Sequence, residues 1–493
     1  MIKRRLKYVV ALLLLIEVSF CFLTYKSYSY KEVDKINEEN KINKEMFAMY
    51  VEQDDGTYKE GEYFPGVTYE LNYDKTNCVD NKKNNVSNDI VTYTNGKLTV
   101  SSSKTVFCYL YFENEAKAYA IYSDTDNSLT FYKNKDSEGI GSTYNNKNVT
   151  AIYSGFESTN YTSASAVPWN GKASSIKSVE VKEEINPISL SYWFYNLTNT
   201  SELNLEKLNT SEVTNMKYAF YNTGYNAKTF ETDIGDFDTS KVTDMYHAFE
   251  NIGYSAEEWS IGDLSNWNTS KNERFNSAFA YAGYSAKSWD IGNLSTKSAT
   301  KDGETYIAWD TSSLINANNM FNSTAYTSSK FNIGDIGTWD VSNINNFDQF
   351  IRRSGYNASE WYIGDLSNWN TSKMQHMVGM FSGAGYNANE FNIGDIGNWN
   401  VSKVSDLGWC FDFTGANAST FYIGDLSNWD TSNVTKMVRT FANTGENANW
   451  SMDLSNWNVN KVIYYYEFNH YNESKITPPK WVNEDVYVPG MEI

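Results

Sequence analysis

Aspartate residues recur at one place in the repeated part of this 493-residue chain, directly after an Ile-Gly pair. The column comprises Asp236, Asp263, Asp335, Asp365, Asp395 and Asp425, with Asn293 in one further copy. If successive copies stack as strands about 4.8 Å apart, these carboxylates repel one another unless turn amides or a cation neutralise them. We favour a turn role. The alternative is a ladder of Ca²⁺ sites, with Asp263, Asp335, Asp365, Asp395 and Asp425 as ligands.

A second column of residues could bind a macromolecule. Most copies contain an aromatic residue, one variable residue and an isoleucine, an alternation typical of a β-strand. The variable side chains should point away from the core; they are Ser260, Asp290, Asn332, Tyr362, Asn392 and Tyr422. Tyr362 and Tyr422 are the strongest candidates for ligand contact, because tyrosine is enriched at binding hot spots. The alternative is an ordinary solvated face.

Catalytic chemistry has little support in the sequence. His247, His376 and His470 have no Ser, Cys or carboxylate signature beside them, and Cys410 occupies a column that is alanine in other copies. Phosphate-binding loops, Gly-x-Ser-x-Gly and zinc-binding helix motifs are all missing. We therefore predict that the protein is not an enzyme. Its net charge of −19 also argues against nucleic acid as a partner.

The elements that position these columns come from a repeat of about 30 residues. Its clearest marker is Trp-Asn-Thr-Ser at 369–372, which returns in related form at 399–402 and 429–432, and nine copies cover more than half the chain. A period of this length indicates a solenoid, a propeller or an array.

Each repeat predicts one strand and one short helix. The fifth, eighth and twelfth residues after the Trp are mostly apolar, as in Met374, Met377 and Phe381. This spacing predicts one face of a helix that Ser372 caps and Gly385 ends. Stacked copies then form an α/β solenoid, like a leucine-rich repeat, with a continuous core. About twelve extra residues in one copy, at 296–308, should form a surface loop.

The chain before the repeats begins with basic residues and an apolar run, the pattern of a signal anchor or a signal peptide. We expect the run to enter a membrane through residues 8–25. The predicted parts are an anchor or signal (1–26), a polar helical stalk (27–46), a small β-rich domain (47–135), an irregular linker and cap (136–189), the repeat solenoid (190–470) and a C-terminal tail or cap (471–493).

Two cysteines flank a predicted hairpin in the β-rich domain. Asn95-Gly96 is a favourable two-residue turn between β-prone runs, and Cys78 and Cys108 lie on either side of it. In an exported protein, such a pair predicts a disulfide. The alternative, a metal site, lacks further ligands nearby.

The columns of the repeat resemble those of the BspA-like leucine-rich-repeat surface proteins of bacteria. The resemblance rests on runs such as Asp238-Thr-Ser-Lys-Val-Thr-Asp-Met245-Tyr-His-Ala-Phe249 and covers about residues 190–470. It implies a cell-surface protein that binds a protein or glycan on host or neighbouring cells. The chain shows no LPxTG-type sorting signal, so we expect the N-terminal helix to anchor it, or the protein to be secreted. A structural envelope spacer and a carbohydrate-directed module remain alternatives.

Overall fold

The computed structural model describes residues 116–134, 140–301 and 303–486, and before them the backbone of strands β1–β8. The chain divides into two compact units, with the boundary between Ala116 and Lys117. The predicted anchor helix at 8–25 lies outside the described residues. Within the described part, no helix has the length and apolar character needed to cross a membrane.

The first unit contains two four-stranded sheets. One has the order β1-β4-β7-β6 and the other the order β3-β2-β8-β5. The strands are β1 (Tyr30–Glu32), β2 (Phe47–Glu52), β3 (Tyr58–Tyr63), β4 (Thr68–Leu71), β5 (Lys75–Asp80), β6 (Val91–Thr94), β7 (Lys97–Val100) and β8 (Val106–Tyr111). Strands β6 and β7 pair antiparallel with Thr94 opposite Lys97, and the predicted Asn95-Gly96 turn lies outside the described residues.

Two of the predicted boundaries differ from the structure. Tyr30–Glu32 was expected in a helical stalk, but it forms β1 and pairs with β4. The β-rich domain was expected to continue to residue 135, but β9 (Lys117–Ser123) and β10 (Ser128–Asn134) belong to the second unit. They do so because β10 pairs in parallel with β14 (Ser178–Val181), the strand that leads into the repeats.

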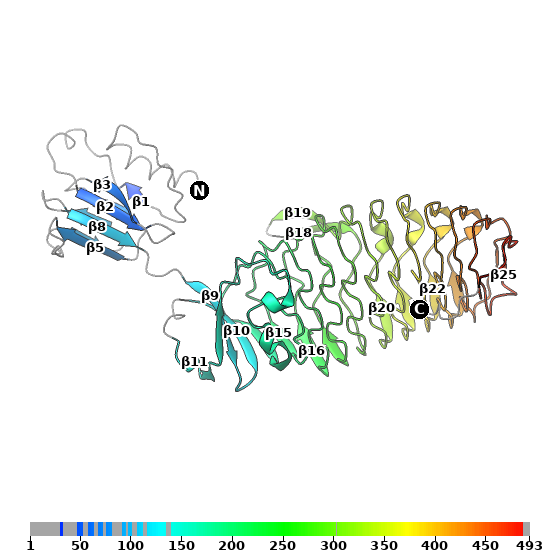
Figure 1. The fold of residues 1–493 in the computed structure, drawn as a ribbon, viewed down its shortest axis with the longest axis horizontal. Coiled ribbons are helices and arrows are strands. Elements are labelled where there is room, and N and C mark those ends of the chain that lie inside the picture. The colour runs from blue at the N-terminus through cyan, green and yellow to red at the C-terminus, as the bar shows by residue number, and fades with distance from the viewer. Residues whose placement is uncertain are drawn as a thin grey trace. The chain divides into compact units, whose positions relative to one another are not determined.

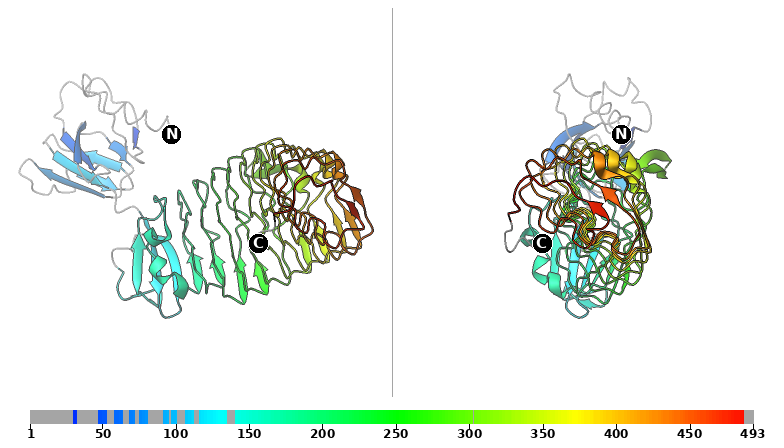
Figure 2. Two further views of the ribbon diagram at one scale, coloured as in Figure 1. Left: turned by 45° about the vertical axis from the view of Figure 1, so that its right-hand side comes forward. Right: turned by 90° about the vertical axis from the view of Figure 1, so that its right-hand side faces the viewer.

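The second unit is a β-rich solenoid in which most repeats supply one short strand. Its first sheet has the order β13-β9-β10-β14-β15-β16-β17, and parallel pairs β20-β21, β22-β23 and β24-β25 follow. Successive coils lie side by side and superimpose when viewed end-on (Figures 1 and 2). The further strands are β11 (Thr143–Tyr144), β12 (Lys147–Asn148), β13 (Ala151–Ser154), β15 (Glu202–Asn204), β16 (Thr229–Thr232), β17 (Glu258–Ser260), β20 (Lys330–Asn332), β21 (Glu360–Tyr362), β22 (Glu390–Asn392), β23 (Thr420–Tyr422), β24 (Met452–Asp453) and β25 (Ile476–Thr477).

The predicted short α-helix of each repeat is wrong. The helices of the described residues are 3₁₀ turns, and none of them covers the segment that we expected to be helical. They are η3 (Ala164–Ala166), η4 (Asn170–Ser175), η5 (Ile336–Thr338), η6 (Leu366–Asn368), η7 (Ile396–Asn398) and η8 (Leu426–Asn428). The Ser after Asn-Thr therefore does not cap a helix. Instead, the side chain of Asn370 accepts a hydrogen bond from the Ser372 amide and shapes a turn.

The expected helical segment is a chain of turns bonded to the next coil. Alternate amides donate within a turn and across to the neighbouring repeat, as Ala219 does to Met216 and Phe220 does to Ala248. The third residue of the first turn, Tyr218, has φ of 54°, a left-handed conformation that type II turns require there. These cross-repeat bonds satisfy the backbone as a sheet would, so the segment needs no helix.

Aromatic stacks form the core, as the apolar columns predicted. Phe220, Phe249, Phe279 and Phe321 are buried and follow one another with ring centroids 5.2–5.6 Å apart. The repeat tryptophans are also buried, and the indole N–H of Trp399 donates to the Leu366 carbonyl of the preceding coil at 3.0 Å. Each Trp thus closes a corner of the core and binds two repeats together.

The insertion at 296–308 forms a β-hairpin. Strands β18 (Lys297–Lys301) and β19 (Glu304–Ala308) pair antiparallel, at the edge of the solenoid opposite β15 and β16 (Figure 1). The hairpin reaches back over earlier coils: the Tyr306 hydroxyl donates to the Asn266 carbonyl at 2.5 Å, and Lys301 Nζ to the Asp236 carbonyl at 2.8 Å. The predicted surface loop is therefore a hairpin that two hydrogen bonds hold against earlier coils of the solenoid.

Candidate functional site

The predicted strand-face residues all lie on the surface, one on each of six successive coils. The six residues Ser260, Asp290, Asn332, Tyr362, Asn392 and Tyr422 are all exposed, and all except Asp290 end a strand. Tyr362 and Tyr422 are 48% and 51% exposed, with the coil of Asn392 between them. Asn332 and Asn392 use their side chains locally, because each accepts the amide of a following Gly. The binding role of this face stays a prediction.

The aspartate column performs the turn role that we favoured. Asp395 Oδ1 accepts the Gly397 amide at 2.9 Å and the Asp425 amide of the next coil at 3.3 Å. Asp335, Asp365 and Asp425 likewise each accept an amide two residues on. Among the described residues, no group of three or more His, Cys, Asp and Glu side chains is arranged to hold a metal ion. These carboxylates therefore bind turns and their neighbouring coils.

One member of the column was assigned in the wrong register. Asp236 follows Ile-Gly in the sequence, but Asp233 occupies the structural position. Asp233 Oδ1 accepts the Gly235 amide, and the amide of the following Ile234 donates to the next coil as Leu264 does. This frees Asp236 for another role.

The backbone register places Cys78 directly opposite Cys108 on the antiparallel pair β5–β8. Directly opposite residues of such a pair have Cα atoms about 4.5–5.5 Å apart, within the range that a disulfide spans. The predicted disulfide is therefore compatible with the strand pairing.

We expect a proteolytic digest prepared without reductant to contain a Cys78 peptide bonded to a Cys108 peptide. Reduction should release the two peptides, each one hydrogen heavier, as mass spectrometry will show. Cys410 is a matched internal control, because it is buried and should react with an alkylating agent only after unfolding. Alkylation of Cys78 and Cys108 in the native, unreduced protein would contradict the pairing.

The histidines and Cys410 do not form a catalytic arrangement. His247 Nδ1 contacts Glu250, and His376 Nδ1 lies 3.9 Å from Asp348, both without a nucleophile in the contact. Burial raises the pKa of the Cys410 thiol well above its ordinary value, which disfavours the reactive thiolate.

A ladder of tyrosines is the most regular feature of the surface. Six rings, one from each of six successive coils, stack with centroids 4.4–4.7 Å apart and interplanar angles of 5–11°: Tyr225, Tyr254, Tyr284, Tyr326, Tyr356 and Tyr386. All six are half-buried, so ring edges remain accessible. Burial, followed by the neighbouring tyrosines, raises the pKa of Tyr284 to about 12. Its phenol is therefore neutral at physiological pH and can both donate and accept hydrogen bonds.

A second aromatic group lies beside the ladder at its N-terminal end. Tyr192, Tyr218 and His247 stack in succession at 5.1 and 4.9 Å, and Lys217 Nζ lies 5.3 Å above the Tyr246 ring. Tyr281 contacts the rings of Tyr254 and Tyr284 and so extends the aromatic surface around the ladder. We call the ladder and this group the tyrosine face.

Sequence reasoning missed the tyrosine face although its signal was present. Five of the six tyrosines of the ladder follow a Gly at the position that was expected to end the helix, as in Gly355-Tyr356 and Gly385-Tyr386, and Tyr326 follows Ala325. We predicted no role for these tyrosines from the sequence. A tyrosine that recurs at one position in six successive copies is the pattern that could have revealed the ladder.

A groove lies beneath the β18–β19 hairpin. Its deeper part has a volume of about 540 Å³, and a second part of about 720 Å³ continues it toward the first repeats. Asp236, Asp238 and Lys301 line both parts, so the two are contiguous. The groove forms because the inserted β18–β19 hairpin lies over residues 233–268 of the earlier coils.

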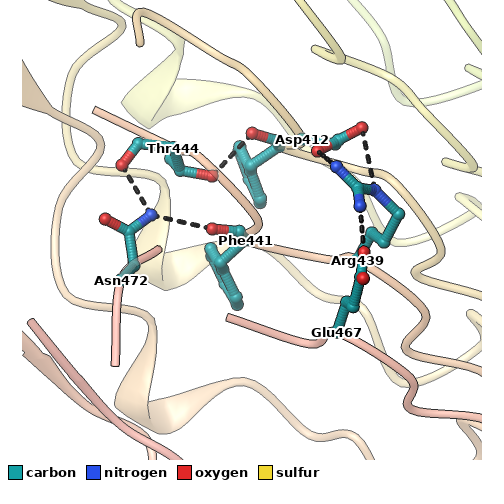
Figure 3. Close-up of polar contacts among 7 residues, drawn as sticks. Asp412, Arg439, Phe441, Thr444, Glu467 and Asn472 are labelled. Carbon is teal, nitrogen blue, oxygen red and sulfur yellow. Dashed lines mark hydrogen bonds and ion pairs between the residues drawn. The ribbon is translucent and has the colours of Figure 1, made fainter. Parts of the chain in front are cut away.

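A charged cluster joins three coils near the C-terminal end of the solenoid (Figure 3). Arg439 Nη2 donates to Asp412 at 3.1 Å, and Arg439 Nη1 contacts Glu467. Asn472 donates nearby to the Phe441 carbonyl at 2.9 Å. Burial raises the pKa of Asp412 to about 6, although Arg439 opposes the shift. Asp412 is buried, and Arg439 and Glu467 are partly buried, which suits a stabilising role better than ligand binding.

Comparison with known proteins identifies one family. The family described as "Mycoplasma protein of unknown function, DUF285" matches residues 188–307, 298–387 and 382–479, which together cover the repeats and more than half of the chain. No curated protein and no solved structure matches the chain. The three tandem matches agree with the repeat architecture. The chain therefore belongs to the DUF285 family of repeat proteins.

Proposed function

We propose that the protein is a non-catalytic binding protein of the bacterial cell surface, which presents its tyrosine face to a protein or glycan on another cell. The observation that carries this proposal is the tyrosine ladder, an accessible aromatic strip that spans six coils. The N-terminal sequence pattern and the resemblance to BspA-like leucine-rich-repeat proteins support surface display, through an anchor or by secretion.

Tyrosine suits this role for physical reasons. A stacked ring has already lost most of its side-chain freedom, so binding costs little further conformational entropy. Its edge offers apolar contact, while its hydroxyl offers a hydrogen bond, and these suit a partner with both kinds of surface. Neighbouring asparagines add polar groups, since Asn357, Asn387 and Asn417 hydrogen-bond to one another along the same coils.

The test compares substitutions on two faces of the solenoid. Each substituted residue is replaced by one that occurs at the same position of another repeat. Tyr254→Ala with Tyr284→Ala removes two rings of the ladder and follows Ala416, which occupies this column in a later coil. Tyr362→Asn with Tyr422→Asn removes two exposed tyrosines of the strand face and follows Asn332 and Asn392. Fluorescent full-length protein is titrated onto cultured epithelial cells and onto bacterial cells, and binding is measured by flow cytometry.

We expect the ladder variant to bind about tenfold more weakly or worse, as loss of a hot spot does, while the strand-face variant binds as the wild type. A melting curve confirms that both variants are folded. If only the strand-face variant loses binding, the assigned face is wrong. If the wild type binds neither cell type, the binding function is wrong and a structural spacer replaces it.

A further inference from the structure

We propose that the groove beneath the β18–β19 hairpin binds an extended cationic segment of a protein, with lysine or arginine side chains directed to its carboxylates. This site lies apart from the tyrosine face and does not depend on the function proposed above. The inference rests on a cavity built by an insertion, on uncompensated negative charge and on a cation of the chain itself that lies within the groove.

The cavity interrupts an otherwise regular surface. The hairpin belongs to a later coil but reaches back to Asn266 and Asp236, which lie on two successive earlier coils. The hairpin thereby covers one side of the groove. The two parts of the groove have volumes of about 540 and 720 Å³. This volume and its length across several coils suit a peptide in extended conformation better than a single ion.

The deeper part of the groove carries excess negative charge. Its lining includes the five carboxylates of Asp233, Asp236, Asp238, Asp263 and Glu304. None of them forms an ion pair within the described part of the chain. The side chains of three of them accept turn amides, which leaves each with a second oxygen for a ligand.

The second part of the groove repeats this imbalance. Glu183, Glu184 and Glu206 line it, together with Lys182 and Lys207. Neither lysine forms a salt bridge with these carboxylates, because Lys182 pairs with Glu180 and Lys207 Nζ donates to a backbone carbonyl at 2.9 Å. Glu183 accepts hydrogen bonds from the Lys133 amide and the Asn134 side chain, and Glu184 accepts one from Asn209. A cationic ligand would therefore meet Glu206 and the second carboxylate oxygen of Glu184.

Lys301 shows how a cation fits this site. Its side chain extends from the hairpin into the groove, lines both parts and donates to the Asp236 carbonyl at 2.8 Å rather than to a carboxylate. The chain thus places one ammonium group where the two parts meet. A ligand cation would lie among the same carboxylates as the Lys301 ammonium group, and Lys301 would repel it.

The probe is a fluorescein-labelled peptide of about ten residues that alternates lysine and serine, so that every second side chain of an extended chain is cationic. Its binding to the full-length protein is followed by fluorescence anisotropy at low and physiological salt. The groove variant combines Asp236→Asn, Asp238→Asn and Glu304→Gln. Its matched control combines Glu231→Gln, Glu258→Gln and Glu390→Gln, three exposed glutamates of the strand face, and changes net charge equally.

We expect the groove variant to bind the probe at least about tenfold more weakly and the strand-face control to bind within about twofold of the wild type. Lys301→Met should bind more tightly than the wild type, an effect that misfolding would not produce. Equal losses in both triple variants would reduce the effect to net charge and overturn the site. If spermine displaces the probe as well as an unlabelled peptide of equal charge does, the peptide class is wrong.

Discussion

Gly394→Ala is expected to lower the free energy of unfolding of the solenoid by about 3–5 kcal/mol, a loss at the upper end for single substitutions. Gly394 has φ of 78°, a conformation that costs other residues about 1–2 kcal/mol. An alanine Cβ there would also overlap Asp365 Oδ1 of the preceding coil. Since that carboxylate is held by the Ser367 amide at 2.9 Å, it cannot turn aside without losing the bond.

Substitutions at three other glycines separate the cost of the backbone conformation from the cost of steric overlap with the added Cβ. Gly155 has φ of 75° but no atom within 4 Å of the methyl group that alanine would add, so Gly155→Ala tests backbone strain alone. Gly397 lacks positive φ, but its Cβ would overlap the Asp425 carbonyl, so Gly397→Ala tests overlap alone. Gly171 has neither feature and should be nearly neutral. Denaturant unfolding measures all four variants.

A double variant tests the contact between Gly394 and Asp365 of the preceding coil. In the Gly394→Ala background, Asp365→Ala removes the overlapping carboxylate and should restore part of the lost stability, although it also removes a turn hydrogen bond. Hydrogen exchange should place the damage at the two coils that meet there, because repeat stability is a sum of nearest-neighbour terms. If Gly394→Ala costs no more than Gly155→Ala, the packing of Gly against Asp does not constrain the repeat.

The sequence predicted the buried columns well, because burial depends on apolar pattern whatever the backbone does. Met374, Met377 and Phe381 are all fully buried, as expected for the inner face of the repeat. The backbone assignment was wrong because a chain of turns can direct side chains inward with nearly the same spacing as a helix. Gly379 and Gly383, both with positive φ, were the contrary signal, since two glycines within a short helix destabilise it.

The surface sites were less predictable. The tyrosine ladder follows from a visible column, but its stacking required knowledge of the coil spacing. The groove could not be predicted, because Asp236 and Glu304 line it together only when the hairpin folds back over earlier coils. No pattern in the sequence indicates the direction in which the hairpin folds. The column of aspartates was predictable in kind, yet Asp233 and Asp236 exchanged places because a shortened copy shifted the Ile-Gly marker.

Arg439→Met is expected to destabilise the C-terminal coils by an amount that grows with pH, from about 1 kcal/mol near pH 4 to about 3 kcal/mol or more at pH 8. In the wild type, burial raises the pKa of Asp412 to about 6 from an ordinary 3.8, against the opposing charges of Arg439 and Arg352. The folded state therefore binds more protons than the unfolded state between these values, and Asp412 makes stability fall as pH rises through that window.

Removing Arg439 leaves the Asp412 carboxylate with less compensation, so its pKa rises further and the window extends to higher pH. At pH 4 Asp412 is largely protonated in the folded state of both the wild type and the variant, so the variant loses little there. The matched control is Asp412→Asn with Arg439→Met, which removes the titrating group and should give a loss that varies little with pH. Thermal or urea unfolding at pH 4, 6 and 8 measures the three proteins. A loss for Arg439→Met that is equal at all three pH values would show that Arg439 acts through packing, for example on Phe413, rather than through the charge of Asp412.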